Sequence, residues 1–194
     1  KPLHISKDGV SDEELRTAFD DTVGSGRVYL YDHFGSLSSS NLLDKIRYLA
    51  KGCDVGWVVL DHLSIAVSGI SAPEGERKAI DVLMTELRSI VEETGIGMIL
   101  VSHLKRPEGN KGFEEGLAIN LNSLRGSAAI AQLSDSVIGL ERNQQSEDEA
   151  NQVTVRVIKN RFSGETGVAT KLYFNKETNR LAEAEFIQDE FNEY

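Results

Sequence analysis

Two short apolar runs, separated by one long amphipathic segment, constrain the fold of this chain more than any other feature. Residues 55–60 and 96–101 are almost continuously apolar, which is typical of strands that are buried on both faces of a sheet. Between them, residues 76–94 place apolar side chains at helical spacing, and Gly95 follows as a C-terminal stop. A strand, a helix and a second strand in this order predict an α/β sheet covered by helices.

The remaining segments extend this pattern on both sides. Residues 11–14 have the form of a capping box and predict a helix whose apolar face carries Leu15, Ala18 and Phe19. Residues 104–120 are polar and Gly-rich and indicate a mobile loop. The other predicted elements are strands at 27–32, 135–140, 152–158 and 170–174, helices at 41–51 and around 123–133, and a turn at 175–179 before a weak strand. We therefore expect a mainly parallel sheet flanked by helices, with antiparallel C-terminal strands.

The composition excludes several classes of protein. The chain has 194 residues, 40% hydrophobic and 27% charged, which is ordinary for one globular domain. Cys53 is the single cysteine, so we expect no intramolecular disulfide and a reducing compartment. We expect no membrane span or signal peptide, and a start at Lys1 suggests a fragment. The net charge of −10 argues against non-specific nucleic-acid binding by the whole surface, but it allows a local basic loop.

The two apolar runs are each followed by a residue that can handle phosphate chemistry. Asp61 follows the first run and His103 follows the second, and ligands bind beyond the carboxyl ends of parallel strands. Asp61 suits Mg²⁺, directly or through water, and His103 can donate a hydrogen bond to a terminal phosphate. Taken singly, Asp61 could instead cap a loop, and a lone histidine is usually structural. His62 is a weaker candidate, because the side chain after Asp61 should point to the opposite sheet face.

Three basic segments lie further along the chain. Lys105 and Lys111 are on the polar loop, where they would either be solvated or contact a nucleic-acid backbone. Residues 124–127 combine an arginine, a flexible glycine and a serine that can contact phosphate. Arg161 follows a strand beside a Gly-containing turn, where it could reach a neighbouring subunit's active site. The alternative for Arg161 is a surface ion pair with Glu165.

These segments occur in the order found in the RecA-fold motor domain of hexameric DnaB-family replicative helicases. The chain resembles this family, and in particular the podovirus-type phage primase-helicases, over nearly its whole length. The matching segments are 60–65, 76–78, 103–105, 114–116, 124–127, 132–135, 140–145, 159–167 and 175–178. The sequence contains no G-x-x-x-x-G-K-[ST] phosphate-binding loop. The resemblance therefore implies a RecA-like P-loop NTPase core that is truncated.

The resemblance also implies roles for residues around the nucleotide. Asp61 corresponds to the Walker B acid for Mg²⁺, and His103 to the γ-phosphate sensor. Arg161 corresponds to an arginine finger that acts on the adjacent subunit, and Arg142 to a second phosphate- or interface-sensing arginine. Phe174 falls where the family places an aromatic side chain against the nucleotide base.

A second set of residues matches the parts of the family that respond to DNA. Gln132 corresponds to a polar residue that couples the sensor strand to the DNA loops. The loops that face single-stranded DNA in the central channel are matched by Lys105, Lys111, Arg125, Gly126 and Ser127.

The activity that the resemblance implies is replicative DNA unwinding. A hexameric ring of the parent would couple hydrolysis of ATP or dTTP, with Mg²⁺, to 5′-3′ translocation on single-stranded DNA. The isolated chain should be inactive for hydrolysis, because the P-loop and the catalytic glutamate are absent. Loss of the strand that leads into the P-loop should leave the strand before His103 with an unpaired edge. If the chain is phage-encoded, its location would be the cytoplasm of the bacterial host.

The C-terminal end and the overall class leave alternatives open. Residues 1–182 would be the C-terminal portion of the motor domain, and residues 183–194 an acidic, flexible tail. In phage relatives such a tail, ending in an aromatic residue, docks on the replicative DNA polymerase, whereas a solubilising tail is the alternative. A non-catalytic RecA-fold accessory protein that binds DNA or docks on a polymerase is the main alternative to a helicase. A recombinase-type ring ATPase is a third possibility.

Overall fold

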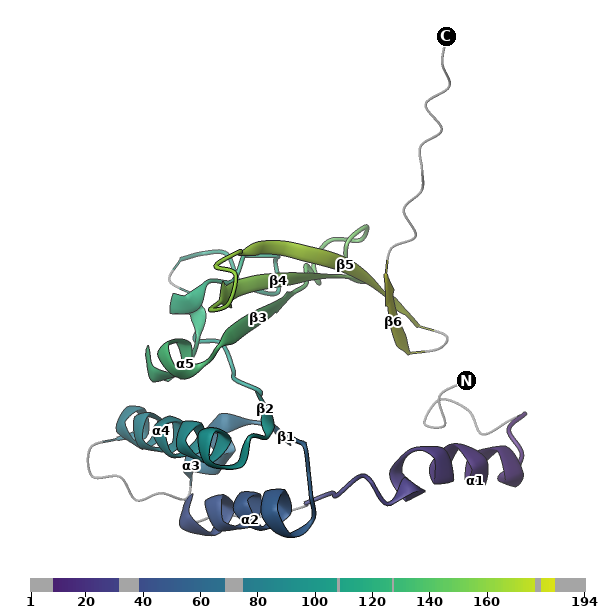
Figure 1. The fold of residues 1–194 in the computed structure, drawn as a ribbon. Helices are drawn as coiled ribbons and strands as arrows, with labels where there is room; N and C mark the ends of the chain where they lie inside the picture. Colours follow the sequence, from purple (N-terminus) through teal and green to yellow (C-terminus); the bar gives the residue numbers. More distant parts are fainter. Residues whose placement is uncertain are drawn as a thin grey trace. The chain divides into compact units, whose positions relative to one another are not determined.

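The computed structural model describes residues 9–31, 39–68, 75–107, 109–126, 128–176 and 179–183. Within it the chain forms two compact units, shown as ribbons in Figure 1. The parallel unit consists of Asp8–Arg106 and Leu121–Ser134, and the antiparallel unit consists of Lys1–Lys7, Pro107–Asn120 and Asp135–Tyr194. The mixed α/β character predicted from the sequence is confirmed.

A strand–helix–strand arrangement forms the centre of the parallel unit. Strands β1 (Trp57–Leu60) and β2 (Gly97–Leu100) pair in parallel, with Leu60 opposite Leu100 at the carboxyl end. The helix α4 (Glu76–Thr94) connects them with the bounds that the apolar periodicity predicts. It ends at Gly95, whose left-handed φ of 73° lets its N–H reach the carbonyl of Val91.

The buried face of α4 organises the hydrophobic core. Its buried residues recur at spacings of three or four and are Ala79, Ile80, Leu83, Met84, Leu87 and Ile90. Residues of α2 (Ser39–Gly52) and α3 (Leu63–Ser68) complete the same cluster, including Leu42, Ile46 and Leu63. The helix predicted at 41–51 is therefore confirmed, with slightly wider bounds. One face of the β1–β2 pair packs on this cluster through Val58, Leu60, Met98 and Leu100.

The prediction that both strands are buried on two faces is wrong for this chain. Trp57 is 69% exposed, Val59 64% and Ile99 51%. Because side chains alternate along a strand, these residues form the face opposite the core, and nothing in the described part of the chain covers it. The described portion of β2 also pairs with β1 alone, which agrees with the unpaired edge expected for this strand.

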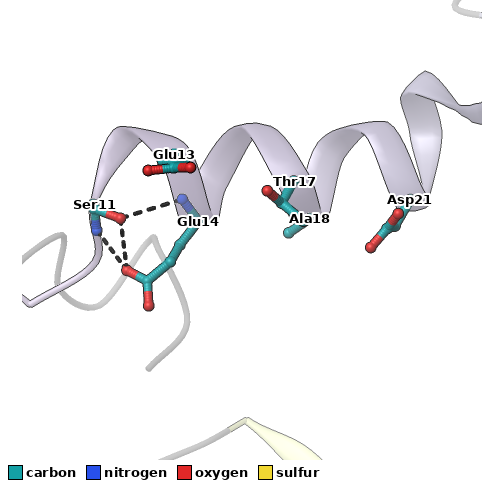
Figure 2. Close-up of a pocket in the computed structure, with 6 residues that line it drawn as sticks. All are labelled: Ser11, Glu13, Glu14, Thr17, Ala18 and Asp21. Atoms are coloured by element: carbon teal, nitrogen blue, oxygen red, sulfur yellow. Dashed lines mark hydrogen bonds between the residues drawn. The ribbon is translucent and has the colours of Figure 1, made fainter.

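The N-terminal segment confirms one prediction and contradicts another. Helix α1 (Asp12–Asp21) begins with the predicted capping box, in which Glu14 N–H donates to Ser11 Oγ and Ser11 N–H donates to the Glu14 carboxylate, as Figure 2 shows. The helix buries none of its residues, and Phe19 is 56% exposed. The strand predicted at 27–32 is absent over residues 27–31, because the β1–β2 sheet has no further described strand with which they could pair. A short η1 (Val23–Ser25) precedes these residues.

The segment predicted as one helix around 123–133 is two short elements. They are η2 (Leu121–Ser123) and α5 (Ala128–Leu133). Gly126 lies between them with a φ of 112°, a conformation incompatible with a continuous right-handed helix. Residues 104–107 and 109–120 contain no helix or strand, as expected for a loop, although isolated bridges join Leu104 to Leu124 and Glu115 to Asn143.

The antiparallel unit is a four-stranded sheet that confirms the predicted C-terminal strands. The strands follow chain order and are β3 (Ser136–Glu141), β4 (Gln152–Asn160), β5 (Gly167–Asn175) and β6 (Arg180–Glu183). Each neighbouring pair is antiparallel. Irregularities in register occur at Val137/Ile138 and at Val155/Arg156. This sheet fixes which residues at the strand ends lie opposite one another.

Candidate functional site

The two strand-end residues predicted to act together lie at the same edge of the parallel pair. Beyond β1 and β2 the backbone ladder continues, since Val101 N–H donates to the Leu60 carbonyl at 3.0 Å and Leu63 N–H donates to the Val101 carbonyl at 2.9 Å. Asp61 and His103 therefore both follow the carboxyl ends of paired strands, and both are exposed. This placement agrees with the prediction from the two apolar runs.

His62 was placed wrongly by the sequence argument. Its imidazole ring lies against that of His103, with the ring centroids 4.0 Å apart and the planes at 35°. The alternation rule holds only within a strand, and the chain has already left β1 at Leu60 and enters α3 at Leu63. The Nδ1 atom of His62 is buried without a hydrogen-bond partner among the described residues. His62 is thus a member of the strand-end cluster that no spacing in the sequence identifies.

The chain after His103 is tied to residues 123–125 by a short antiparallel ladder. Arg125 N–H donates to the His103 carbonyl at 2.9 Å, and Lys105 N–H donates to the Ser123 carbonyl at 2.9 Å. Leu104 and Leu124 form the bridge between these two hydrogen bonds. The backbone of the predicted phosphate sensor is therefore directly bonded to that of a predicted DNA-contacting arginine.

The side chains of this ladder are exposed and are held by few contacts. Lys105 is exposed, and Arg125 Nη2 lies 3.7 Å from Glu76 Oε2, with about half of each side chain exposed. Such a surface pair contributes about 0–1 kcal/mol to stability, so a phosphate could readily compete for the arginine. Gly126 allows the backbone at this position to pack closely against Ile80 of α4, because a Cβ there would lie 2.4 Å from Ile80 Cδ1.

The other predicted DNA residues are divided between the two units. Gln132 lies on α5 of the parallel unit and is exposed, whereas Lys111 is exposed on the loop of the antiparallel unit. Ser127 lies outside the described residues. The structure therefore brings Lys105, Arg125 and Gly126 together with His103, within a single unit.

Arg161 is the first residue after β4 in the antiparallel unit. Its N–H donates to the Asp135 carbonyl at 2.8 Å, and its Nη1 lies 2.9 Å from Asp135 Oδ1. The following turn is held by Asn160, whose Oδ1 accepts from the N–H of Phe162 at 3.0 Å and of Ser163 at 3.3 Å. The alternative weighed from the sequence paired Arg161 with Glu165. The ion pair found here is with Asp135, a residue to which the sequence assigned no partner.

Arg142 and Phe174 lie at less exposed positions of the same unit. Arg142 follows β3, and its Nε donates to the Ala150 carbonyl at 2.6 Å, which ties it to the connection between β3 and β4. Phe174 is half-buried in β5, and its N–H donates to the Asn151 carbonyl at 2.8 Å. These contacts fix the backbone around both residues.

A part-buried ion pair that the sequence did not reveal crosslinks this sheet. Arg156 donates two hydrogen bonds to the Glu141 carboxylate, at 2.7 and 3.0 Å, and Ile119 N–H donates to the same carboxylate at 2.7 Å. The Glu141 side chain is only 9% exposed. Burial raises the pKa of Glu141, but the hydrogen bonds from Arg156 and Ile119 outweigh it and hold the pKa below its ordinary value.

The donor set at the strand ends fits a magnesium–nucleotide ligand better than a protein metal cage. No group of three or more His, Cys, Asp or Glu side chains suited to a metal ion occurs in the described ranges. Asp61 supplies one exposed carboxylate at the sheet edge. This fits Mg²⁺, which commonly uses one or two carboxylates together with water and substrate phosphates.

Among the described residues, no helix is long and apolar enough to span a membrane.

Comparisons with known proteins match this arrangement. The family model for the DnaB-like helicase C-terminal domain matches residues 5–183. The DNA helicase/primase of Enterobacteria phage T3 is 44% identical over 188 residues, which cover 96% of this chain and 32% of that protein. The chain therefore spans about a third of the length of this relative.

Solved structures show the same fold at low sequence identity. A DnaB-like replicative helicase, described with its interactions with primase, superposes with a TM-score of 0.71 at 21% identity, over 92% of this chain and 42% of that one. A KaiC-like protein from Pyrococcus horikoshii superposes with a TM-score of 0.58 at 19% identity, over 91% of this chain and 72% of that one. These likenesses confirm a RecA-like fold.

The lowered pKa of Glu141 predicts an acid-sensitive contribution to stability. The ionised carboxylate stabilises the fold at pH values above its ordinary pKa, near 4.3, and this contribution is lost as the pH falls through the lowered pKa. Glu141→Gln should therefore lower the melting temperature at pH 6. It should also reduce the further drop in melting temperature between pH 6 and pH 3. Circular dichroism follows the unfolding. Glu165→Gln, at an exposed position of the same unit, is the charge-matched control; equal acid sensitivity of wild type and Glu141→Gln would contradict the prediction.

Proposed function

The chain belongs to the family of DnaB-like helicase C-terminal domains, and we propose that it forms part of the nucleotide-driven motor of a replicative DNA helicase. The observation that carries the proposal is the strand-end cluster, where Asp61 and His103 share one sheet edge and the His103 carbonyl is bonded to Arg125 N–H. In this proposal Asp61 and His103 face the nucleotide, and His103 is one backbone hydrogen bond from Arg125, a candidate DNA contact. Because the chain spans about a third of its relative, activity, substrates and partners all belong to this proposal.

The nucleotide side of the mechanism uses the two strand-end residues. Asp61 would hold Mg²⁺, directly or through a water molecule, and the bound ion would supply charge neutralisation at the phosphates of ATP or dTTP. His103 donates a hydrogen bond to the terminal phosphate and so distinguishes the triphosphate from the diphosphate. Its ring is held against that of His62, which limits the orientations in which it can donate.

The DNA side of the mechanism follows from the ladder after His103. Any displacement of the His103 backbone on phosphate release acts directly on Arg125 through their 2.9 Å hydrogen bond, and on Lys105 two residues further along. Lys105, Arg125, Gly126 and Ser127 would contact the backbone of single-stranded DNA, together with Lys111 from the polar loop. Gln132 would couple these loops to the sensor. The net charge of −10 fits contact confined to such loops rather than spread over the surface.

The arginines complete a site that is shared between subunits of a hexameric ring. Arg161, 45% exposed at the end of β4, would stabilise charge on the transferring phosphoryl group of the neighbouring subunit. Arg142 would sense phosphate or the interface, and Phe174 would lie against the nucleotide base. Translocation would run 5′-3′ along single-stranded DNA.

The limits of the motor part are proposed as residues 1–182, with residues 183–194 as an acidic tail. The tail beyond Glu183 lies outside the described residues. Its acidic residues and terminal aromatics, Phe191 and Tyr194, support docking on a replicative DNA polymerase.

The sequence has no phosphate-binding loop motif, so hydrolysis would need that loop from outside these 194 residues. The second candidate is a non-catalytic accessory protein that binds DNA or docks on a polymerase, and the presence of Asp61, His103 and Arg161 together disfavours it. If the chain is phage-encoded, its location would be the cytoplasm of the bacterial host.

A chimera decides between the motor and the accessory protein. In it, this chain replaces the matching 188 residues of the phage T3 DNA helicase/primase, and NTP hydrolysis is measured with single-stranded DNA. The chimera should hydrolyse NTP, Asp61→Ala should reduce the rate to background, and Arg161→Ala should reduce it by about 10³–10⁵-fold. Glu165→Ala, on the same exposed turn as Arg161, is the control that should retain activity. Hydrolysis that survives both Asp61→Ala and Arg161→Ala would refute the motor assignment.

A salt titration tests the proposed DNA contacts. In the same chimera, Lys105→Ala and Arg125→Ala should each weaken binding of an oligonucleotide of single-stranded DNA. Each should also reduce the slope of log K against log salt by about 0.7, the value for one lost phosphate contact on a single strand. Arg88→Ala removes the same charge from α4, where Arg88 pairs with Glu92 at 2.9 Å, and should leave the slope unchanged. Unchanged slopes for Lys105→Ala and Arg125→Ala would exclude these contacts.

A further inference from the structure

Arg161 is fixed to its own chain by the residue directly opposite it in the antiparallel sheet. Asp135 immediately precedes β3 and Arg161 immediately follows β4, and the last pair inside these strands is Ser136 with Asn160. The two residues therefore form the next rung of the ladder. One hydrogen bond joins their backbones at 2.8 Å, and the ion pair joins Arg161 Nη1 to Asp135 Oδ1 at 2.9 Å.

We propose that Asp135 is the positioning residue for Arg161, holding its guanidinium in the orientation required at the neighbouring subunit's nucleotide site. The proposal rests on the function proposed above, in which Arg161 acts as an arginine finger. It assigns to Asp135 a role through Arg161 alone, with no contact between Asp135 and the nucleotide.

The exposure of the two side chains indicates that the ion pair mainly orients the Arg161 guanidinium and adds little to the stability of the fold. The two side chains are 45% and 35% exposed, and ion pairs at such positions contribute little to the free energy of unfolding. An unrestrained arginine loses rotamer entropy when it is ordered. A pair formed before the nucleotide arrives removes part of that cost from the catalytic step, because preorganised charge needs no reorganisation during the reaction.

The neighbouring Arg156 shows how different a structural contact is. Arg156 uses two nitrogens on the part-buried Glu141 carboxylate, with only 28% of its own side chain exposed. In Arg161 the ion pair with Asp135 engages Nη1. The Asp135 contact therefore constrains the orientation of the more exposed guanidinium of Arg161.

The geometry of the turn beyond Arg161 supports the same conclusion. Asn160 receives two backbone N–H groups of the turn on its Oδ1, and Gly164 N–H donates to the Asn160 carbonyl at 3.0 Å. The backbone on both sides of Arg161 is thus hydrogen-bonded, to Asp135 on one strand and within the turn on the other. The ion pair with Asp135 adds a restraint at the tip of the Arg161 side chain.

Steady-state kinetics of the chimera with the phage T3 helicase/primase test this role. Asp135→Ala should lower kcat by about 10–100-fold, the range typical of a lost outer partner, with KM for the nucleotide changed less than about twofold. Asp135→Asn keeps an acceptor oxygen and should retain more of kcat than Asp135→Ala. The double variant Asp135→Ala/Arg161→Ala should be no slower than Arg161→Ala alone, because both changes act through one group. Glu165→Ala is again the matched exposed control.

The outcomes separate this inference from the motor assignment. If Arg161→Ala lowers kcat but neither Asp135 variant does, the positioning role is overturned and the motor assignment stands. If Arg161→Ala has no effect, the arginine-finger assignment itself fails. A further loss when Asp135→Ala is added to Arg161→Ala would place Asp135 in another role and overturn the inference. If Asp135→Ala does not fold, as judged by circular dichroism, Asp135→Asn decides: unchanged kcat contradicts the proposal, and reduced kcat with unchanged KM and melting temperature supports it.

Discussion

The parallel register of β1 with β2 is the constraint on which the candidate site depends. Leu60 lies opposite Leu100, and the ladder continues through Val101, so Asp61 and His103 must meet at one edge. The hydrophobic cluster to which α4, α2 and α3 contribute favours this register, because alternate side chains of both strands pack against it. A shift of one residue would turn those apolar side chains away from the core. The core that stabilises the unit therefore also brings Asp61 and His103, the proposed acid and sensor, to the same sheet edge.

The features that depend on local pattern were predictable from the sequence. The bounds of α4, its glycine stop and the capping box at Ser11 all follow from spacing within a few residues. The family's functional segments were also recognisable, because their order along the chain is specific. Asp61 and His103 could be placed together for a similar reason, since Asp61 directly follows a readable apolar run and His103 follows another after Ser102.

The features that depend on long-range partners were not predictable. Residues 27–31 have the alternation of a strand, but no described strand is available to pair with them. The apolar runs were expected to be covered on both faces, and Trp57 and Val59 are instead exposed. His62 was predicted to be the weaker candidate by strand alternation, which does not apply because the chain leaves β1 before it, and Asp135 was not singled out because only strand register places it opposite Arg161. Neither relation leaves a signature in one sequence.

The proposed motor divides one nucleotide site between two parts of the chain. Asp61 and His103 belong to the parallel unit, and Arg161 belongs to the antiparallel unit. In a ring, the acid of one subunit would act on the same nucleotide as the arginine of its neighbour.

The most direct measurement mixes two inactive forms of the chimera, Asp61→Ala and Arg161→Ala, and follows NTP hydrolysis of the mixture. Mixed rings contain interfaces with an intact acid and an intact arginine, so activity should reappear in proportion to such interfaces. Mixed rings that assemble but remain inactive at all ratios would contradict a site shared between subunits.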